Sequence, residues 1–279
     1  MFKKSIAMLL CAACFLTAAQ TFVSAAGSEP LYVAVYMDSE AVNTGSSAFL
    51  LDGTTFVPIR EVSAALGADT ISWRSDTGTA CVIDEGLELS ARAGQTYVVA
   101  NGRYLYIPDG VQNIGGKIMV PVRVLCQAFG AQVEWNAAER AVYITTTGEP
   151  IESGDTYYNA DDLYWLSHII NAEAGCEPLT GKIAVGNVVL NRCASAQFPD
   201  SVYGVVFDRR YGTQFTPIDN GSIYYTPNDE SVIAAKLALD GADTAGGSLY
   251  FIASYCAAYS WAGRNRPFVS QIGNHCFYA

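Results

Sequence analysis

The stretch Phe56-Val57-Pro58-Ile59-Arg60 decides the fold of the first half of this chain, because it recurs as Met119-Val120-Pro121-Val122-Arg123. The similarity continues downstream of both stretches. The matching residues are Ala65, Leu66, Gly67 and Ala68 with Ala128, Phe129, Gly130 and Ala131, then Trp73 with Trp135, and Val82-Ile83 with Tyr143-Ile144. Two copies of one pattern indicate a single module built on an internal repeat.

Each copy of the repeat predicts the same series of elements. A short strand leads into the Pro-x-Arg element, and a helix starts there and ends at Gly67 or Gly130. Strands that carry the Trp and the β-branched run follow the helix. We therefore expect an α+β module over residues 27–147.

A polar segment rich in Gly, Ser and Thr follows this module and has no apolar periodicity. It predicts a flexible linker over residues 148–156. A different pattern begins at Tyr157, so we expect a second domain over residues 157–279.

The N-terminus has the order of a secretory signal peptide. Lys3 and Lys4 precede an apolar run, and small residues end at Ala25 and Ala26. We predict a signal peptide over residues 1–26. The apolar run is shorter than the ~20 residues of a membrane-spanning helix, so we expect no stable membrane anchor after cleavage and a location outside the cytoplasm.

Composition excludes several classes of protein. The chain has 279 residues, of which 51% are hydrophobic and 15% charged, enough apolar side chains for two cores. A disordered chain is therefore excluded. Its 16 Lys and Arg against 27 Asp and Glu give a net charge of −11. Since nonspecific affinity for nucleic acid comes from basic residues, we expect no nucleic-acid partner.

Six cysteines remain after the predicted signal peptide, two in the first domain and four in the second. They are Cys81, Cys126, Cys176, Cys193, Cys256 and Cys276. An even number on each side in an exported protein is typical of disulfides. Buried free thiols are the alternative, and the sequence leaves both open.

The second domain opens with a helix that carries a candidate catalytic acid. Asn159 is a predicted N-cap, and the apolar positions that follow have helical spacing and include Ile169 and Ile170. Glu173 continues this apolar face just before Gly175 ends the helix. Because burial raises the pKa of a carboxyl group, Glu173 is a candidate general acid. A carboxylate paired with an Arg in the core is the alternative.

The surroundings of Glu173 resemble a known family. Glu173-Ala174-Gly175-Cys176-Glu177-Pro178 is followed by Gly181, a helix over 184–192, Phe198-Pro199, Gln214-Phe215-Thr216-Pro217, a helix from Asp229 to Leu239 ended by Gly241, the strand-like Leu249-Tyr250-Phe251, and Ile272-Gly273-Asn274-His275-Cys276-Phe277-Tyr278. Over nearly all of 157–279 this pattern is similar to the SleB-type cell-wall hydrolases, which include the spore-cortex-lytic enzymes. The chain departs from that pattern at Gly175 and Cys176, where the family has Arg and Gly.

The resemblance implies a mainly helical, lysozyme-like domain with a small β element that cleaves between the sugars of peptidoglycan. It assigns the catalytic acid to Glu173 and implies lytic transglycosylase chemistry, in which one carboxyl acts first as acid and then as base. A catalytically inactive protein that binds wall glycan is the alternative. The candidate substrate-binding residues are Glu177, Gln214, Tyr250, Asn274 and His275, each with a structural role as its alternative.

The repeat module resembles the copper amine oxidase N-terminal-like domain over Val42 to Thr147. The chain has two histidines, His168 and His275, and neither lies in this module, so we expect no metal and no cofactor. An accessory, wall-associating role and a simple spacer are both open. We expect Arg60 and Arg123 to make repeated structural contacts. The expected protein is a secreted or wall-associated monomer with peptidoglycan strands as its partner.

Overall fold

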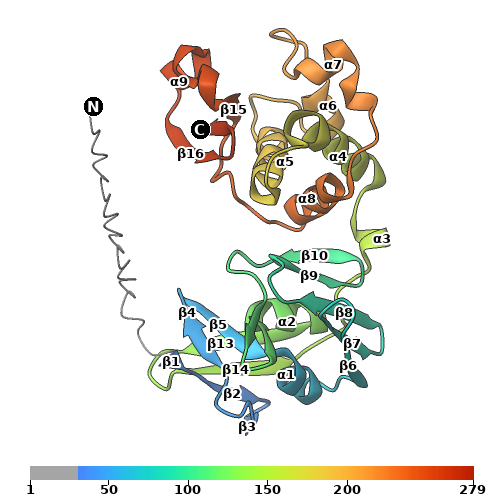
Figure 1. Cartoon of the computed structure of the whole chain (residues 1–279), viewed down its shortest axis with the longest axis vertical. Helices are drawn as coiled ribbons and strands as arrows, with labels where there is room; N and C mark the ends of the chain where they lie inside the picture. The colour runs from blue at the N-terminus through green and yellow to red at the C-terminus, as the bar shows by residue number, and fades with distance from the viewer. Residues whose placement is uncertain (1–30) are drawn as a thin grey trace, which may run out of the picture.

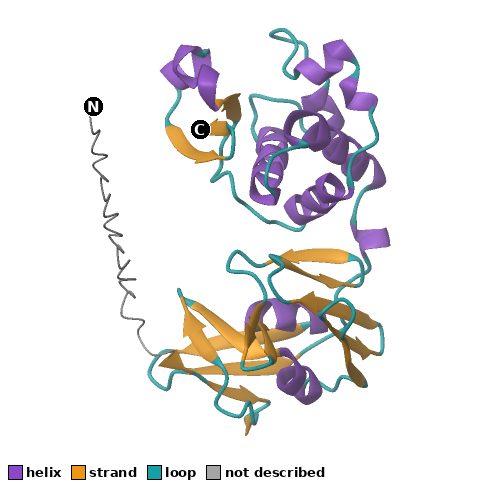
Figure 2. Ribbon diagram, viewed as in Figure 1, coloured by secondary structure: helices purple, strands orange, loops and turns teal. Residues whose placement is uncertain are grey.

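The computed structural model describes residues 31–279, in which a strand-rich part precedes a helix-rich part (Figures 1 and 2). The α+β fold class is confirmed, with most strands in the first module and most helices in the second domain. The predicted signal peptide lies outside the described residues. Among residues 31–279, no helix combines the length and the apolarity that crossing a membrane requires.

The first module contains three sheets. Its elements are β1 (Leu31–Tyr32), β2 (Ala34–Met37), β3 (Glu40–Ala41), β4 (Phe49–Leu51), β5 (Thr54–Pro58), α1 (Ile59–Ala65), β6 (Thr70–Arg74), β7 (Thr79–Asp84), β8 (Leu87–Arg92), β9 (Tyr97–Ala100), β10 (Arg103–Tyr106), β11 (Gln112–Ile114), β12 (Lys117–Pro121), α2 (Val122–Phe129), β13 (Ala131–Asn136) and β14 (Ala141–Thr146). The strand orders are β1-β4-β5-β12-β11, β10-β9-β8-β7-β6 and β13-β14-β2-β3.

The two repeats meet at β5 and β12, which pair antiparallel in the first of these sheets. Val57 lies opposite Val120, and the neighbouring pairs are Pro58 with Met119 and Phe56 with Pro121. Val57 and Val120 occupy the same position in the two copies of the repeat. The strand pair therefore relates the repeats by an approximate twofold axis.

The two repeat helices begin and end where the sequence predicts. Both start directly after a proline, which has no backbone N–H to leave unpaired at a helix start. Gly130 ends α2 with a left-handed φ of 65°. A Cβ at this position would stand 2.0 Å from the carbonyl oxygen of Glu149, so no other residue fits without moving the backbone.

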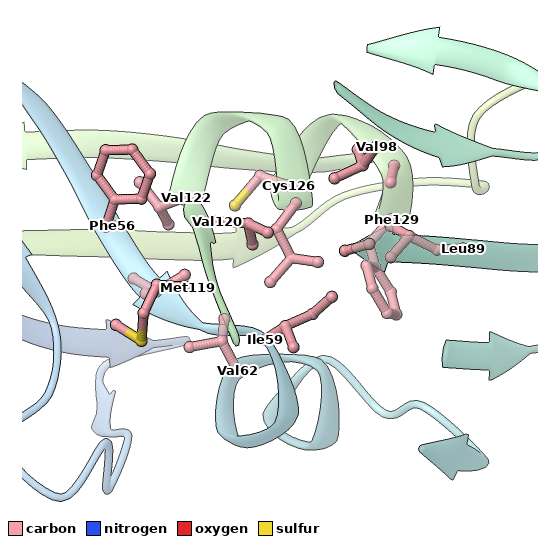
Figure 3. Close-up of a cluster of buried hydrophobic side chains, with 14 of the residues drawn as sticks. Phe56, Ile59, Val62, Leu89, Val98, Met119, Val120, Val122, Cys126 and Phe129 are labelled. Carbon is pink, nitrogen blue, oxygen red and sulfur yellow. The ribbon is translucent and has the colours of Figure 1, made fainter. Parts of the chain in front are cut away.

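The core of the module lies where the helices meet the strands. Figure 3 shows side chains from α1, α2 and the middle strands pointing toward one another, among them Phe56, Val62, Met119, Cys126 and Phe129 of the buried cluster. Because apolar side chains from both repeats enter this one cluster, burial of apolar surface holds the two copies together as a single folded unit.

Residues 148–156, which the sequence predicts to be a flexible linker, make hydrogen bonds to the first module. The N–H of Ile151 donates to the carbonyl of Ala128 at 3.0 Å, and the N–H of Gly154 donates to Asn101 at 2.7 Å. Asn101 Nδ2 also donates to the carbonyl of Ile151 at 2.9 Å. Ile151 is buried in the module core. The polar composition of residues 148–156 predicted mobility, but backbone groups of this segment form hydrogen bonds with the first module.

The second domain is a helical bundle with a small sheet. Its elements are α3 (Gly154–Tyr157), α4 (Ala160–Ala174), α5 (Leu179–Ala194), α6 (Val202–Val206), α7 (Thr216–Asn220), η1 (Ser222–Tyr224), α8 (Asp229–Leu239), β15 (Tyr250–Ala253), η2 (Ser254–Tyr259), α9 (Trp261–Asn265), β16 (Phe268–Ile272) and β17 (His275–Tyr278). The sheet has the order β15-β17-β16, and α4, α5 and α8 pack against one another.

Local sequence signals set the ends of α4 as predicted. The Asn159 side chain accepts hydrogen bonds from the backbone N–H groups of Asp161 and Asp162, both at 3.0 Å. This satisfies two of the free donors at the helix start. Ile169 and Ile170 are fully buried in the domain core. The predicted helix from Asp229 to Leu239 is also confirmed.

The hairpin β9–β10 connects the module to the helical domain, and Figure 1 shows it on the side that faces α8. Asp240, at the end of α8, has a side chain only 1% exposed and forms a salt bridge with Arg103 of β10. The Asp240 carboxylate also accepts hydrogen bonds from the hydroxyl of Tyr158 and, at 3.2 Å, from the backbone N–H of Tyr104. Burial raises the pKa of Tyr158, and its hydrogen bond to Asp240 raises it further.

The six cysteines of the described residues all have free thiols. Cys81, Cys126 and Cys276 are buried, while Cys176 and Cys256 are exposed. Of the two alternatives that the sequence left open, the structure therefore has the free thiols.

Candidate active site

Glu173 lies in the last turn of α4, where the end of a helix leaves room for a side chain at the domain surface. It continues the face that buries Ile169 and Ile170, and is itself half-buried. Its carboxyl group has no hydrogen-bond partner among the described residues. Burial raises the pKa of Glu173 to about 7, because an ionised carboxylate loses its hydration there. Glu173 therefore still holds a proton near neutral pH.

Glu177 lies four residues further along, in the turn between α4 and α5, and its environment is the opposite. Its carboxylate accepts hydrogen bonds from Asn274 at both oxygens, from the backbone N–H and from Nδ2, each at 2.9 Å. Burial alone would raise the pKa of Glu177, but these hydrogen bonds and the nearby His275 and Lys182 lower it. The Glu177 carboxylate thus binds the turn before β17 through hydrogen bonds from Asn274.

His275 begins β17 and packs edge-on against Phe251, with ring centroids 5.2 Å apart. It is buried, and its Nδ1 has no hydrogen-bond partner among residues 31–279. Burial lowers the pKa of His275, and the charge of Glu177 opposes this shift. A buried ring nitrogen without a partner in the described chain is uncommon, because most buried polar side-chain atoms are hydrogen-bonded.

Gln214 and Tyr250 line one pocket of about 710 Å³. Tyr250 projects from β15, and its hydroxyl accepts a hydrogen bond from Arg266 at 3.2 Å. The Gln214 amide donates to the carbonyl of Gly212 in its own loop at 3.1 Å. Trp261, which is 56% exposed, also lines this pocket. Polar groups beside exposed aromatic rings are typical of ligand sites.

Arg192 of α5 lies buried beneath this pocket and is a site component that the sequence did not predict. Its guanidinium stacks near three rings, Phe198 at 4.9 Å, Phe215 at 5.2 Å and Tyr250 at 5.5 Å. Its Nε donates to the carbonyl of Leu249 at 2.8 Å. Within the described chain, Arg192 makes no salt bridge. A buried cation beneath aromatic rings stiffens the pocket floor.

A second unpredicted feature of the pocket is the pair Asp208 and Arg210. The Arg210 guanidinium donates to both oxygens of Asp208, at 3.0 Å from Nε and 2.9 Å from Nη2. The Arg210 hydrogen bond holds the pKa of Asp208 below its ordinary value. The Asp-x-Arg spacing was the available signal, but spacing alone does not tell a pair inside a pocket from one on an exposed loop.

The structure brings the predicted residues together in two groups. Glu177, Asn274 and His275 form one group beside the C-terminal end of α4, and Gln214 and Tyr250 share the pocket. Phe251 links the groups, because it packs on His275 and lies 6.3 Å from the ring of Phe215, the residue after Gln214. Glu173 does not line the pocket. Tyr278 of β17 is buried and unavailable for stacking.

Within residues 31–279, no cluster of three or more His, Cys, Asp or Glu side chains is arranged to hold a metal ion. The first module contains no histidine, so the resemblance to a copper enzyme's N-terminal domain brings no imidazole ligands with it.

Two known families match parts of this chain. Residues 176–278 match the Cell Wall Hydrolase family. The first module matches a different family, the copper amine oxidase N-terminal domain, over residues 36–144. Both resemblances are thus confirmed. The Cell Wall Hydrolase match includes Glu177 and the pocket but begins three residues after Glu173.

Curated relatives carry the same kind of domain. The chain is 37% identical over 132 residues to a spore cortex-lytic enzyme of Oceanobacillus iheyensis, which is 47% of this chain and 46% of that protein. It is 34% identical over 120 residues to the spore cortex-lytic enzyme of Bacillus subtilis, 43% of this chain and 38% of the relative. The matches thus span less than half the length of these relatives.

Solved structures with similar sequences are catalytic domains. The SleB catalytic domain of Bacillus cereus is 36% identical, with a TM-score of 0.40, and the match covers 44% of this chain and 92% of that domain. The catalytic domain of the germination-specific lytic transglycosylase SleB of Bacillus anthracis is 35% identical, with a TM-score of 0.40, over 46% of this chain and all of that domain.

Proposed function

We propose that this protein is a peptidoglycan-cleaving glycosidase with Glu173 as its general acid and base. The observation that carries the proposal is the half-buried carboxyl at the end of α4, with a pKa raised to about 7, directly before a segment that matches the Cell Wall Hydrolase family. A carboxyl group that keeps its proton near pH 7 is what cleavage of a glycosidic bond requires.

In the proposed reaction, protonated Glu173 donates its proton to the glycosidic oxygen as the bond to the anomeric carbon breaks. Positive charge develops on the ring in an oxocarbenium-like state. The Glu173 carboxylate formed in this step then accepts the proton of the attacking hydroxyl, which restores the acid. If the attacking group is the 6-hydroxyl of the muramic acid itself, the product is an anhydro sugar and the enzyme is a lytic transglycosylase.

The surroundings of Glu177 support the transglycosylase form of the proposal. Burial raises the pKa of Glu173, whereas the hydrogen bonds from Asn274 help to lower the pKa of Glu177. Since Asn274 occupies both oxygens of Glu177, a single working carboxyl fits a mechanism in which the substrate supplies its own nucleophile.

The pocket supplies the glycan-binding part of the proposal. Tyr250 and Trp261 present ring faces for stacking on sugars, and Gln214 and Arg210 offer polar contacts. The relatives named spore cortex-lytic enzymes support wall glycan as the substrate and a secreted or wall-associated location. The protein would act as a monomer without a cofactor.

Lysis of purified peptidoglycan by wild type and Glu173→Gln tests the function. The amide keeps the shape of the carboxyl but donates no proton, so we expect turbidity to fall with wild type and the rate to drop at least about 100-fold in the variant. Asp161→Asn, an exposed carboxylate on the same helix, is the matched control and should retain full activity. Equal lysis by Glu173→Gln would contradict the assignment of Glu173.

Mass analysis of the released fragments separates the possible reactions. Anhydro ends are expected for the transglycosylase, and reducing ends alone would reject that subtype while keeping glycosidase activity. One observation favours a second function: the family match excludes Glu173, and Gly175 and Cys176 depart from the family pattern. Binding without any lysis by wild type would establish an inactive glycan-binding protein.

A further inference from the structure

The first module has two pockets that lie at equivalent places in the two copies of the internal repeat. The first, of about 440 Å³, is lined by Ile59, Arg60, Ile71, Trp73, Ala80 and Ile118 among others. The second, of about 270 Å³, has the residues at the equivalent places in the strand register, where Val142 lies opposite Trp135 as Ala80 lies opposite Trp73. These residues are Val122, Arg123, Val133, Trp135, Val142 and Thr55. Both volumes are near the lower end of small-ligand pockets, roughly 300–1,000 Å³. The duplicated sequence has therefore kept two copies of one cavity.

Each pocket is built from both repeats. The first takes its helix and the β6–β7 strands from the first copy and β12 from the second, whereas the second pocket takes α2, β13 and β14 from the second copy and β5 from the first. The paired strands β5 and β12 thus supply one wall of each pocket. Each repeat contributes a strand to the pocket of the other because the twofold axis passes through the pair Val57 and Val120.

Both pockets present a tryptophan with a large open surface. Trp73 is 48% exposed and Trp135 is 39% exposed. Burying an indole ring contributes favourable free energy. Each repeat nevertheless leaves its tryptophan exposed at the pocket wall. An exposed indole face next to a cavity offers a flat apolar surface on which a sugar ring stacks.

Both pockets also contain an arginine that has no polar partner within residues 31–279. Arg60 and Arg123 are exposed, and neither makes a hydrogen bond or a salt bridge with the described residues, so the expectation that they make structural contacts is wrong. The other cation of the first pocket, Lys117, is paired with Glu61 at 2.9 Å. Arg123 is the one charged residue among those lining the second pocket. In an acidic protein, each pocket therefore keeps one guanidinium that is unpaired in the part of the chain that the structure describes.

We propose that these two pockets are equivalent binding sites for a carboxylate-bearing glycan, with the Trp stacking on a sugar ring and the Arg pairing with the carboxylate. A guanidinium matches a carboxylate with two parallel hydrogen bonds. The choice of peptidoglycan as that glycan rests on the proposed function, because its sugars carry peptide stems with free carboxylates. Two such sites on one folded module bind a repeating strand more tightly than either does alone.

The test is calorimetric titration of the full chain carrying Glu173→Gln, which binds without cleaving. The probe is a soluble disaccharide-peptide from digested peptidoglycan, and a second probe is the same molecule with its carboxyls amidated. Arg60→Gln combined with Arg123→Gln should weaken binding of the first probe in the module sites by at least about tenfold. The double variant should leave binding of the amidated probe unchanged.

Trp73→Ala combined with Trp135→Ala should weaken binding of both probes, because stacking does not depend on the carboxylate. Arg140→Gln is the matched control, since Arg140 is exposed in the same module and lines neither pocket. Circular dichroism melting of each variant verifies folding. If the tryptophan variant fails to fold, the arginine variant, which changes only exposed side chains, carries the test.

Wild-type affinity in the double-arginine variant, or an equal loss for the amidated probe, would overturn the proposal. Product release by chains with Glu173 intact is measured separately on short fragments, where the double-arginine variant should keep wild-type kcat. If the double-arginine variant loses binding and the chain with Glu173 intact releases no product, the glycosidase is rejected and the module sites are supported. If product release is normal and the double-arginine variant binds as wild type does, the module sites are rejected and the glycosidase is supported.

Discussion

At the scale of single residues, the buried carboxyl of Glu173 has an energetic cost that depends on pH. Its pKa is about 7 in the folded chain against an ordinary 4.5, so the folded state binds more protons between these values. The free energy of unfolding then falls as pH rises from 4.5 to 7. We predict that Glu173→Gln stabilises the protein at pH 8 by up to about 3 kcal/mol, and leaves it unchanged below pH 4.5.

Urea unfolding of both proteins at the two pH values measures this difference. Asp161→Asn, with its exposed side chain, should give no such gain at the higher pH. A Glu173→Gln variant that is less stable than wild type at pH 8 would contradict the burial of this carboxyl as described.

At the scale of elements, the turn between β16 and β17 is fastened to the start of α5 through Glu177. Gly273 in this turn has a φ of +55°, and a Cβ there would stand 1.9 Å from Glu177 Oε2, so the turn lies directly on the carboxylate. Asn274→Ala removes the hydrogen bond from Nδ2 and should lower the free energy of unfolding at pH 7 by about 1.5–3 kcal/mol.

The loss of unfolding free energy in Asn274→Ala should depend on pH, because the pKa of Glu177 is lowered in the folded chain. A depressed folded pKa contributes stability above the unfolded value, and this contribution disappears as pH falls through the folded pKa. The gap between wild type and Asn274→Ala should therefore close in acid. Asn265→Ala, which loses a hydrogen bond to the backbone of Trp261, is the control, and it should show no closing gap.

Sequence predicted those elements whose signals are local. The caps at Asn159 and Gly130, the helix ending at Leu239 and the repeated Pro-x-Arg elements all depend on residues within a few positions of one another. The placement of Arg192 beneath Tyr250 joins residues 58 positions apart, and no local pattern reports it. The linker shows the same limit, because the partners of its backbone groups lie on β9–β10 and α2.

At the scale of the whole molecule, Asp240 determines how firmly the two domains are joined. Its carboxylate accepts hydrogen bonds from Arg103, Tyr104 and Tyr158 in a nearly closed environment. Removing one partner of a buried ion pair costs about 3–5 kcal/mol, because it leaves the other charge without compensation. We predict that wild type unfolds in one calorimetric transition and that Asp240→Asn separates it into two.

Asp155→Asn tests whether any loss of charge at the junction has this effect. Asp155 is exposed at the start of α3 and makes no salt bridge with described residues, so its variant should keep the single transition. Two transitions in the wild type would show that the contact through Asp240 is too weak to couple the domains.

The pairing of β5 with β12 has a consequence for how such a module arises. One copy of the repeat alone would leave the edge of its middle strand open, and open edges pair with other chains. Since Val57 faces its own equivalent, a second identical copy fits that edge by a twofold axis, as in a homodimer. Tandem duplication turns this contact between molecules into one within a chain. From then on each half can change separately, as the Lys117–Glu61 pair of a single pocket illustrates.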